Sequence, residues 1–186
     1  MASSKVSTGL NLTSNFFLQN FYRHNRKAMK ASTRDDYTKT ELSYEDSRAL
    51  KRAAAKLASF EYTDDENGDN IVSTIQAFVD TYNYTMESSS SSDSDTYRQN
   101  RQLKALTKKY GDDLKDIGIS IEENGTLSVS ENILKGSSVK EIRKVFSEDS
   151  DYVQNIRTIA KRMNTSSYNE IYAQMTGAGG RISIVL

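Results

Sequence analysis

The stretch DLKDIGISIEENGTLSVSENILK, residues 113–135, alternates apolar and polar residues on both sides of Asn124-Gly125. Asn-Gly adopts positive backbone φ angles at low cost, and between two alternating runs it is the strongest short-range signal of a β-hairpin. The alternating apolar residues are Ile117, Ile119, Ile121, Leu127 and Val129. A lone hairpin is only marginally stable in water. The sequence therefore predicts a small hairpin, at about residues 117–129, whose apolar face docks on a helix.

Apolar residues spaced three and four apart form two helical seams before the hairpin turn, the pattern of helices that pack at shallow crossing angles. The first seam is Ile71, Ile75, Phe78, Val79, Tyr82 and Met86, and the second is Leu103, Leu106, Tyr110, Leu114 and Ile117. Residues 87–96 between them are rich in serine and acidic residues, which indicates a flexible connector. So short a connection predicts an antiparallel helix pair.

Other helices are marked by their caps and by apolar spacing. Ser43-Tyr44-Glu45-Asp46 resembles a capping box after a linker at 33–42, and Leu50, Ala53, Ala54, Leu57 and Phe60 follow at helical spacing. Asn70 is a candidate cap for the helix that carries the first seam. Ser138 and Glu141 form another capping-box pattern, before a helix that ends at Phe146. SEDSD (147–151) is expected to begin a further helix, with a separate short piece at 168–175.

The fold class predicted is mainly α, an antiparallel bundle or coiled-coil-like helix pair with one β-hairpin. Residues 1–13 are small and polar and are expected to be a disordered arm. Residues 14–175 are expected to form the bundle, beginning with a basic, aromatic helix from Ser14. TGAGGRISIVL (176–186) is expected to be a flexible tail.

The composition restricts the classes of protein that remain. The 186 residues include no cysteine and no proline, so disulfides and thiolate metal sites are excluded. No apolar run approaches the ~18 residues that span a bilayer. The N-terminus lacks the apolar core of a Sec signal, which predicts synthesis in the cytoplasm.

Charge is balanced overall but divided unevenly along the chain. Residues 1–60 carry 11 basic and 5 acidic side chains, residues 61–96 carry 9 acidic and no basic ones, and residues 97–186 carry 14 basic and 11 acidic ones. This division predicts complementary segments that lie together, contacts between copies, or solvated faces of different sign.

Patterns that would indicate catalysis or metal binding are weak. His24 has no acidic residue at helical spacing to orient it as a base. If Gly68 took the sixth position of a calcium loop, Thr63 and Thr74 would stand where carboxylates are required. The basic stretch 21–34 lacks a groove-reading motif, so nucleic acid is not favoured as a partner. We therefore expect that the protein is not an enzyme and that it binds no metal and no cofactor.

The segment from Ile71 to Phe146 resembles the C-terminal region of the flagellar filament-capping protein family, also called hook-associated protein 2. The matching elements occur in the family's order: AFVDTYN (77–83), the serine run, LKALTKKY (103–110), LKDIGISIEENGTLSVSENIL (114–134) and VKEIRKVF (139–146). The scaffold positions that the resemblance implies are Phe78, Val79, Tyr82, Asn83, Ile117, Gly118, Ile119, Gly125, Leu127 and Phe146. Asn83 lies beside the first seam, where its amide is expected to bond a neighbouring turn or the hairpin backbone.

The resemblance implies a structural role without catalytic residues. Members of this family leave the cell through the flagellar secretion channel, form a ring at the filament tip and help flagellin to insert. The β-rich outer domains and the long C-terminal helix of the family are not recognisable here, so the chain resembles a truncated or divergent member.

The function predicted is a non-enzymatic assembly protein that contacts itself and flagellin-like proteins, exported by the flagellar secretion system. The alternative is a cytoplasmic helical adaptor or regulatory module that joins no filament.

Overall fold

The computed structural model describes residues 34–62, 68–91, 94 and 96–176. Its elements are η1 (Arg34–Asp36), α2 (Lys39–Ala58), α3 (Gly68–Ser88), α4 (Tyr97–Lys109), α5 (Gly111–Asp116), β1 (Ile119–Ile121), β2 (Leu127–Val129), α6 (Glu131–Gly136), α7 (Val139–Phe146) and α8 (Asp151–Thr176). The chain is mainly helical with one antiparallel hairpin, as predicted. The expected N-terminal arm, the helix from Ser14 and the tail after Thr176 lie outside the described residues.

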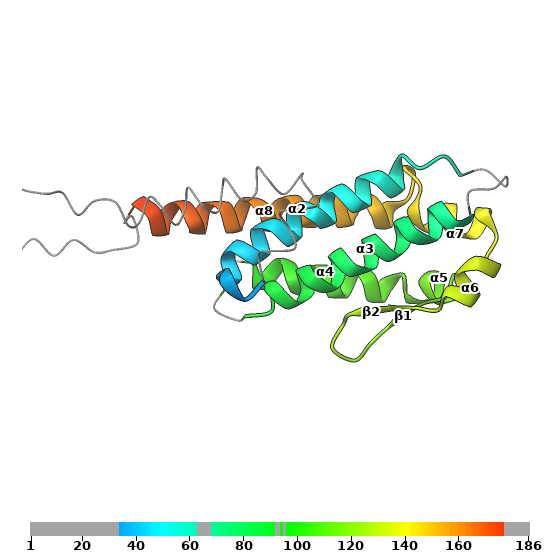
Figure 1. Ribbon diagram of the computed structural model, residues 1–186, viewed down its shortest axis with the longest axis horizontal. Coiled ribbons are helices and arrows are strands. Elements are labelled where there is room, and N and C mark those ends of the chain that lie inside the picture. The colour runs from blue at the N-terminus through cyan, green and yellow to red at the C-terminus, as the bar shows by residue number, and fades with distance from the viewer. Residues whose placement is uncertain (1–33, 63–67, 92–93, 95, 177–186) are drawn as a thin grey trace, which may run out of the picture.

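Four long helices run lengthwise in a bundle, and the short helices gather near one end (Figure 1). Helix α2 packs most extensively on α8 and α3, while α4 lies against α8. Helices α2 and α8 are antiparallel, since Thr40 at the start of α2 donates to Glu170 (2.9 Å) and the Asn164 amide donates to the Tyr44 carbonyl (2.8 Å). The C-terminal end of α8 projects beyond the other helices (Figure 1).

The core is continuous through the bundle and the hairpin. Every residue of the first predicted seam is buried, as are Leu103, Leu114 and Ile117 of the second. Leu106 and Tyr110 pack against this core from half-buried positions. Apolar periodicity therefore identified the buried faces of α3 and α4 correctly.

The start of α2 differs from the prediction. The capping box is Thr38 with Glu41, whose carboxylate accepts from the Thr38 backbone amide at 2.8 Å. Ser43 instead lies within the helix and is buried, where its hydroxyl accepts a hydrogen bond from Ser167 on α8 (3.1 Å). The expected linker at 33–42 is thus replaced by η1 and the first turn of α2. The capping box at Ser138 and Glu141 is confirmed.

Helix α3 is longer than expected at both ends. It begins at Gly68, so Asn70 lies inside its first turn and is not the cap. It ends at Ser88, so the connector is shorter than 87–96. Ser88, Ser89 and Thr96 are buried, and Asn100 of α4 donates to the Met86 carbonyl and to the Ser89 hydroxyl, both at 2.9 Å. The ends of the connector are therefore held by the bundle.

Two further predictions about helix continuity were wrong. The second seam is divided into α4 and α5 at Tyr110-Gly111, where Ile121 of the hairpin approaches so closely that a Cβ on Gly111 would lie 3.4 Å from its Cδ1. The expected break before 168 is absent, since α8 runs unbroken from Asp151 to Thr176. The expected antiparallel pair of α3 and α4 is also not the main contact, because α2 with α8 and with α3 packs more extensively.

Candidate interaction site

The hairpin is attached to α3 through the side-chain amide of Asn83. Its Nδ2 donates to the Leu127 carbonyl (2.9 Å), and its Oδ1 accepts from the Leu127 amide (2.7 Å). Leu127 pairs with Ile121 in the hairpin, but both of its backbone polar groups bond Asn83. An unpaired strand edge leaves its backbone groups to be satisfied by other partners. The expectation that Asn83 bonds the hairpin backbone is confirmed.

Two glycines shape the hairpin. Gly125 has φ 90° in the turn, where its amide donates to the Glu122 carbonyl at 2.8 Å. Gly118 has φ 80° where α5 joins β1, and its carbonyl accepts from the Ser130 amide at 2.8 Å. Residues that carry a Cβ rarely adopt such φ angles. The predicted Asn-Gly turn is present, in a loop of residues 122–126. The paired strands cover only residues 119–121 and 127–129 of the predicted hairpin at 117–129.

The remaining scaffold residues form the packing beneath the hairpin. Phe78 meets Phe146 edge to face, with ring centroids 5.4 Å apart, and Tyr152 of α8 contacts both rings. Val79 and Tyr82 are buried on the same helix, while Ile117 and Ile119 are fully buried beside them. Such aromatic pairs contribute about 0.5–1.5 kcal/mol beyond area burial. The ten scaffold positions thus lie on α3, the α5–hairpin segment and α7.

These ten positions build the unit and are not a contact surface. Nine are buried and Asn83 is half-buried, so a partner protein meets other side chains.

Burial raises the pKa of two tyrosine hydroxyls in this core. It raises the pKa of Tyr82 to about 12, and it also raises the pKa of Tyr152. The Tyr82 hydroxyl has no hydrogen-bond partner, although the nearby Thr107 hydroxyl acts against burial and lowers its pKa. The Tyr152 hydroxyl lies 3.3 Å from the Thr107 hydroxyl.

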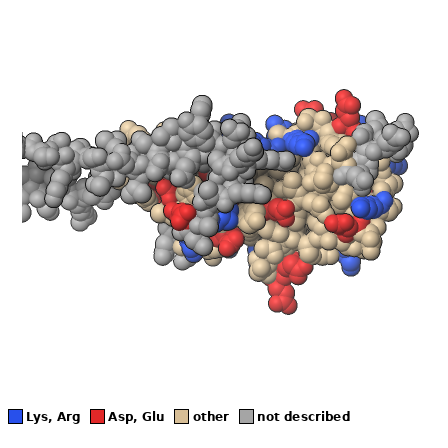
Figure 2. Space-filling view, viewed as in Figure 1, with Lys and Arg blue, Asp and Glu red and all other residues tan. Residues whose placement is uncertain are grey.

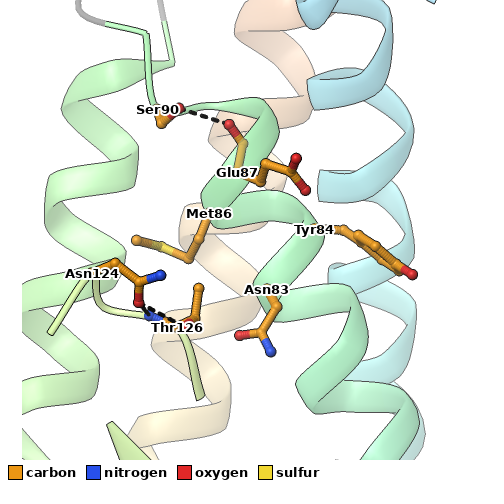
Figure 3. A pocket seen from close by; sticks show the side chains of 7 residues that line it. All are labelled: Asn83, Tyr84, Met86, Glu87, Ser90, Asn124 and Thr126. Atoms are coloured by element: carbon orange, nitrogen blue, oxygen red, sulfur yellow. Dashed lines mark hydrogen bonds between the residues drawn. The ribbon is translucent and has the colours of Figure 1, made fainter. Parts of the chain in front are cut away.

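A groove of about 390 Å³ opens between the end of α3 and the hairpin turn. Its lining residues are Asn83, Tyr84, Met86, Glu87, Ser90, Asn124 and Thr126 (Figure 3). Met86 points toward the hairpin turn and supplies an apolar floor, while Tyr84 points to the opposite side, toward α2. Glu87 is the one acidic residue in this lining and is exposed, while Glu122 and Glu123 are exposed in the hairpin turn, where the Glu122 carboxylate accepts from the Ser128 hydroxyl (2.6 Å). Figure 2 shows acidic atoms on the projection formed by the hairpin turn.

Arg34 holds η1 against α2 and against the side of α3 that carries Tyr84. Its guanidinium forms two hydrogen bonds with the Asp46 carboxylate, both at 2.9 Å, and lies 4.4 Å from the centroid of the Tyr84 ring. Such bidentate pairs are directional as well as charge-assisted. The pairing with Asp46, assisted by Glu87, raises the pKa of Arg34. This contact was not predicted from the sequence, because charge pairs twelve residues apart follow no helical spacing.

Two exposed tyrosines near the C-terminal end of α8, together with half-buried Tyr44 of α2, form a second surface. Tyr168 and Tyr172 stack with ring centroids 6.5 Å apart and are 44% and 57% exposed, while Tyr44 of α2 lies 6.2 Å from Tyr168. We call Tyr44, Tyr168 and Tyr172 the tyrosine face. Tyrosine gives a large, rigid and amphipathic contact area, and it is enriched in protein interfaces.

Within the described ranges no three His, Cys, Asp or Glu side chains are grouped so that they could hold a metal ion. Nor does any helix in those ranges have the length and apolar character needed to cross a membrane. No protein-family model, curated protein or solved structure matches this chain. The resemblance to filament-capping proteins therefore rests on the motifs of the sequence and on the order in which they occur.

Proposed function

We propose that this chain is a non-enzymatic structural protein, similar to the helical core of the flagellar filament cap, that acts by associating with itself and with flagellin-like proteins. The observation that supports this most is the double hydrogen bond between Asn83 and Leu127. These two residues are more than forty positions apart in the segment that carries the resemblance, and the fold brings them into contact. The same unit brings Phe78 against Phe146, the first and last of the resembling positions.

The tyrosine face is the surface that best suits self-association. Tyr168 and Tyr172 are exposed near the C-terminal end of α8, which lies at the opposite end of the bundle from α5, α6 and α7 (Figure 1). Aromatic residues in such positions commonly supply most of the binding energy of an interface. Export by the flagellar secretion system is part of this proposal.

The alternative is a helical adaptor that shares the core but joins no filament and stays in the cytoplasm. It uses the same exposed surfaces for a different partner. Association among copies and with flagellin distinguishes the two proposals.

Size exclusion with light scattering tests self-association, from micromolar to near-millimolar full-length protein. The apparent mass should rise with concentration, and the double substitution Tyr168→Ser/Tyr172→Ser should abolish the rise. Ile133→Ser is the control, because Ile133 is 52% exposed on α6, at the opposite end of the bundle from the C-terminal end of α8 (Figure 1). A protein that stays monomeric at all concentrations would exclude self-association.

A further inference from the structure

The exposed turn of the hairpin carries a chemically labile dipeptide, Asn124-Gly125. In an Asn-Gly pair the backbone nitrogen of the glycine can attack the side-chain carbonyl carbon of the asparagine, because no Cβ on the glycine hinders the approach. Asn124 is exposed to solvent, which supplies the base and the water that this reaction uses. The chain's other Asn-Gly pair begins at Asn67, which lies outside the described residues.

The folded turn holds both reacting groups in hydrogen bonds. The Gly125 amide must lose its proton before it attacks, yet its N–H donates to the Glu122 carbonyl at 2.8 Å and Gly125 is buried. Oδ1 of Asn124 accepts from the Thr126 amide (2.9 Å) and the Thr126 hydroxyl (2.7 Å), which fixes the carboxamide (Figure 3). A hydrogen bond made by the protonated form of a group disfavours its deprotonation. The closed turn therefore resists the reaction.

The hairpin is attached to α3 at the outer edge of β2. Its strands pair over three residues each, and a hairpin so short is only marginally stable on its own. The two hydrogen bonds between Asn83 and Leu127 hold its outer edge. We therefore expect detachment of the hairpin from α3 and opening of the turn to occur together. Such local opening requires less free energy than unfolding of the whole chain.

We propose that Asn124 is a site of spontaneous deamidation that reacts when the hairpin detaches from α3, and that one of the two products prevents the hairpin from docking again. In the open state the Gly125 nitrogen gives its proton to solvent base and forms a bond to Cγ of Asn124. The side-chain nitrogen takes up a proton and leaves as ammonia, which gives a cyclic imide. Water then opens the imide, so the net reaction consumes one water, releases one ammonia and transfers no electrons.

The two products differ in what they do to the turn. Attack of water at Cγ gives an aspartate, whose side-chain oxygen can still accept from both donors of Thr126. Attack at the backbone carbonyl carbon gives an isoaspartate, in which the main chain runs through the former side chain and is longer by one carbon. This moves Gly125 relative to Ile121 and Leu127, which close the paired region. The isoaspartate therefore leaves the hairpin detached from Asn83, and the change is one-way.

Deamidation kinetics of the full-length chain test whether hairpin opening controls the reaction. Asn67→Gln in all variants removes the other Asn-Gly pair, and peptide mass spectrometry follows Asn124 in mildly alkaline buffer. A synthetic peptide of residues 119–129 gives the unprotected rate. When opening and closing are fast, the rate follows the population of the open state. We expect Asn124 to react at least about tenfold more slowly in the folded chain than in the peptide, and Asn83→Ala to speed it about tenfold, which equals about 1.4 kcal/mol.

Ile171→Ala is the control for general loss of stability. Ile171 is buried on α8 but is not part of the continuous core that includes Ile119 and Leu127 of the hairpin, so its loss should leave the rate unchanged. Equal rates in the folded chain and the peptide would overturn the proposal, because the closed turn would then give no protection. An unchanged rate in Asn83→Ala would also overturn it. Equal acceleration by Asn83→Ala and Ile171→Ala would do the same, because unfolding of the whole chain would then expose the site.

Hydrogen exchange of the separated products tests the effect on docking. Ion exchange separates aged chains into the parent, the aspartate and the isoaspartate. We expect the Leu127 amide to exchange as fast in the isoaspartate chains as in Asn83→Ala, whereas the aspartate chains and the variant Asn124→Asp keep the protection of the parent. Parent-like protection of Leu127 in the isoaspartate chains would contradict the proposed one-way change.

Discussion

The side-chain amide of Asn83 bonds both backbone polar groups of Leu127, at 2.9 and 2.7 Å. Asn83 thus substitutes for one residue of a neighbouring strand, because it offers one donor and one acceptor to the outer edge of β2. The contact fixes how the hairpin lies on α3. It also explains why a marginal two-stranded hairpin is ordered here.

Asn83→Ala should destabilise the fold by about 1–3 kcal/mol, because both backbone groups of Leu127 lose their partner while partly buried. Urea unfolding should show a lower midpoint with an unchanged slope. The Leu127 amide should also exchange its hydrogen faster. Asn132→Ala, at an exposed site on α6, is the matched control and should cause no loss. Equal stability of Asn83→Ala and the parent chain would show that the Asn83–Leu127 hydrogen bonds do not stabilise the fold.

Three glycine-to-alanine substitutions should differ in a fixed order. Gly118→Ala should cost most, because φ is 80° and the new Cβ would lie 2.8 Å from Ile133 Cβ and 3.0 Å from the Ser130 carbonyl oxygen. Gly125→Ala should cost about 1–2 kcal/mol for its φ of 90°, since the Lys104 side chain that it meets can move aside. Gly136→Ala has open space and is the control, with little or no loss. Thermal unfolding of the three variants gives the order, and a Gly118→Ala variant as stable as Gly136→Ala would contradict it.

Two buried tyrosines should respond oppositely to removal of the hydroxyl. Tyr82→Phe should be neutral or slightly stabilising, because its buried hydroxyl has no hydrogen-bond partner. Tyr152→Phe should cost about 1 kcal/mol, because it leaves the Thr107 hydroxyl without its partner at 3.3 Å. Chemical denaturation of both single variants measures the difference. A larger loss for Tyr82→Phe than for Tyr152→Phe would show that the polar contacts are assigned to the wrong ring.

The buried phenols should also make stability fall in alkali. Burial raises the pKa of Tyr82 from the ordinary value near 10 to about 12, so between these values the unfolded chain releases a proton that the folded chain keeps. The contribution of Tyr82 to the free energy of unfolding is constant below about pH 10 and falls as the pH rises. It stops changing above the pKa that Tyr82 has in the folded chain. One such group contributes about 1.4 kcal/mol per pH unit. Unfolding free energies from pH 9 to 11 should therefore fall less steeply for Tyr82→Phe than for the parent, and parallel curves would refute this role.

Local patterns in the sequence predicted the parts of the fold that local physics controls. The apolar seam from Ile71 to Met86, the Asn124-Gly125 turn and the Ser138 cap depend on spacing within a few residues, and all are present. The Asn83 contact was predictable because a polar side chain beside an apolar seam near a hairpin has few other partners.

Contacts between distant segments decided what the sequence did not reveal. Ser43 looked like a cap, but it is buried against Ser167 of α8, and Asp46 bonds Arg34. A separate helical piece was expected at 168–175, yet Asn164 and Ser167 bond α2 and α8 is continuous. The groove combines α3 with the hairpin turn, so it exists only after the two are docked.

Binding to flagellin is tested by a calorimetric titration of the full-length chain with purified flagellin monomer from the same organism. We predict saturable binding with a negative heat-capacity change, as expected when apolar surface is buried between proteins. Heats indistinguishable from dilution, together with a strictly monomeric chain, would contradict it and leave the helical adaptor as the function to pursue.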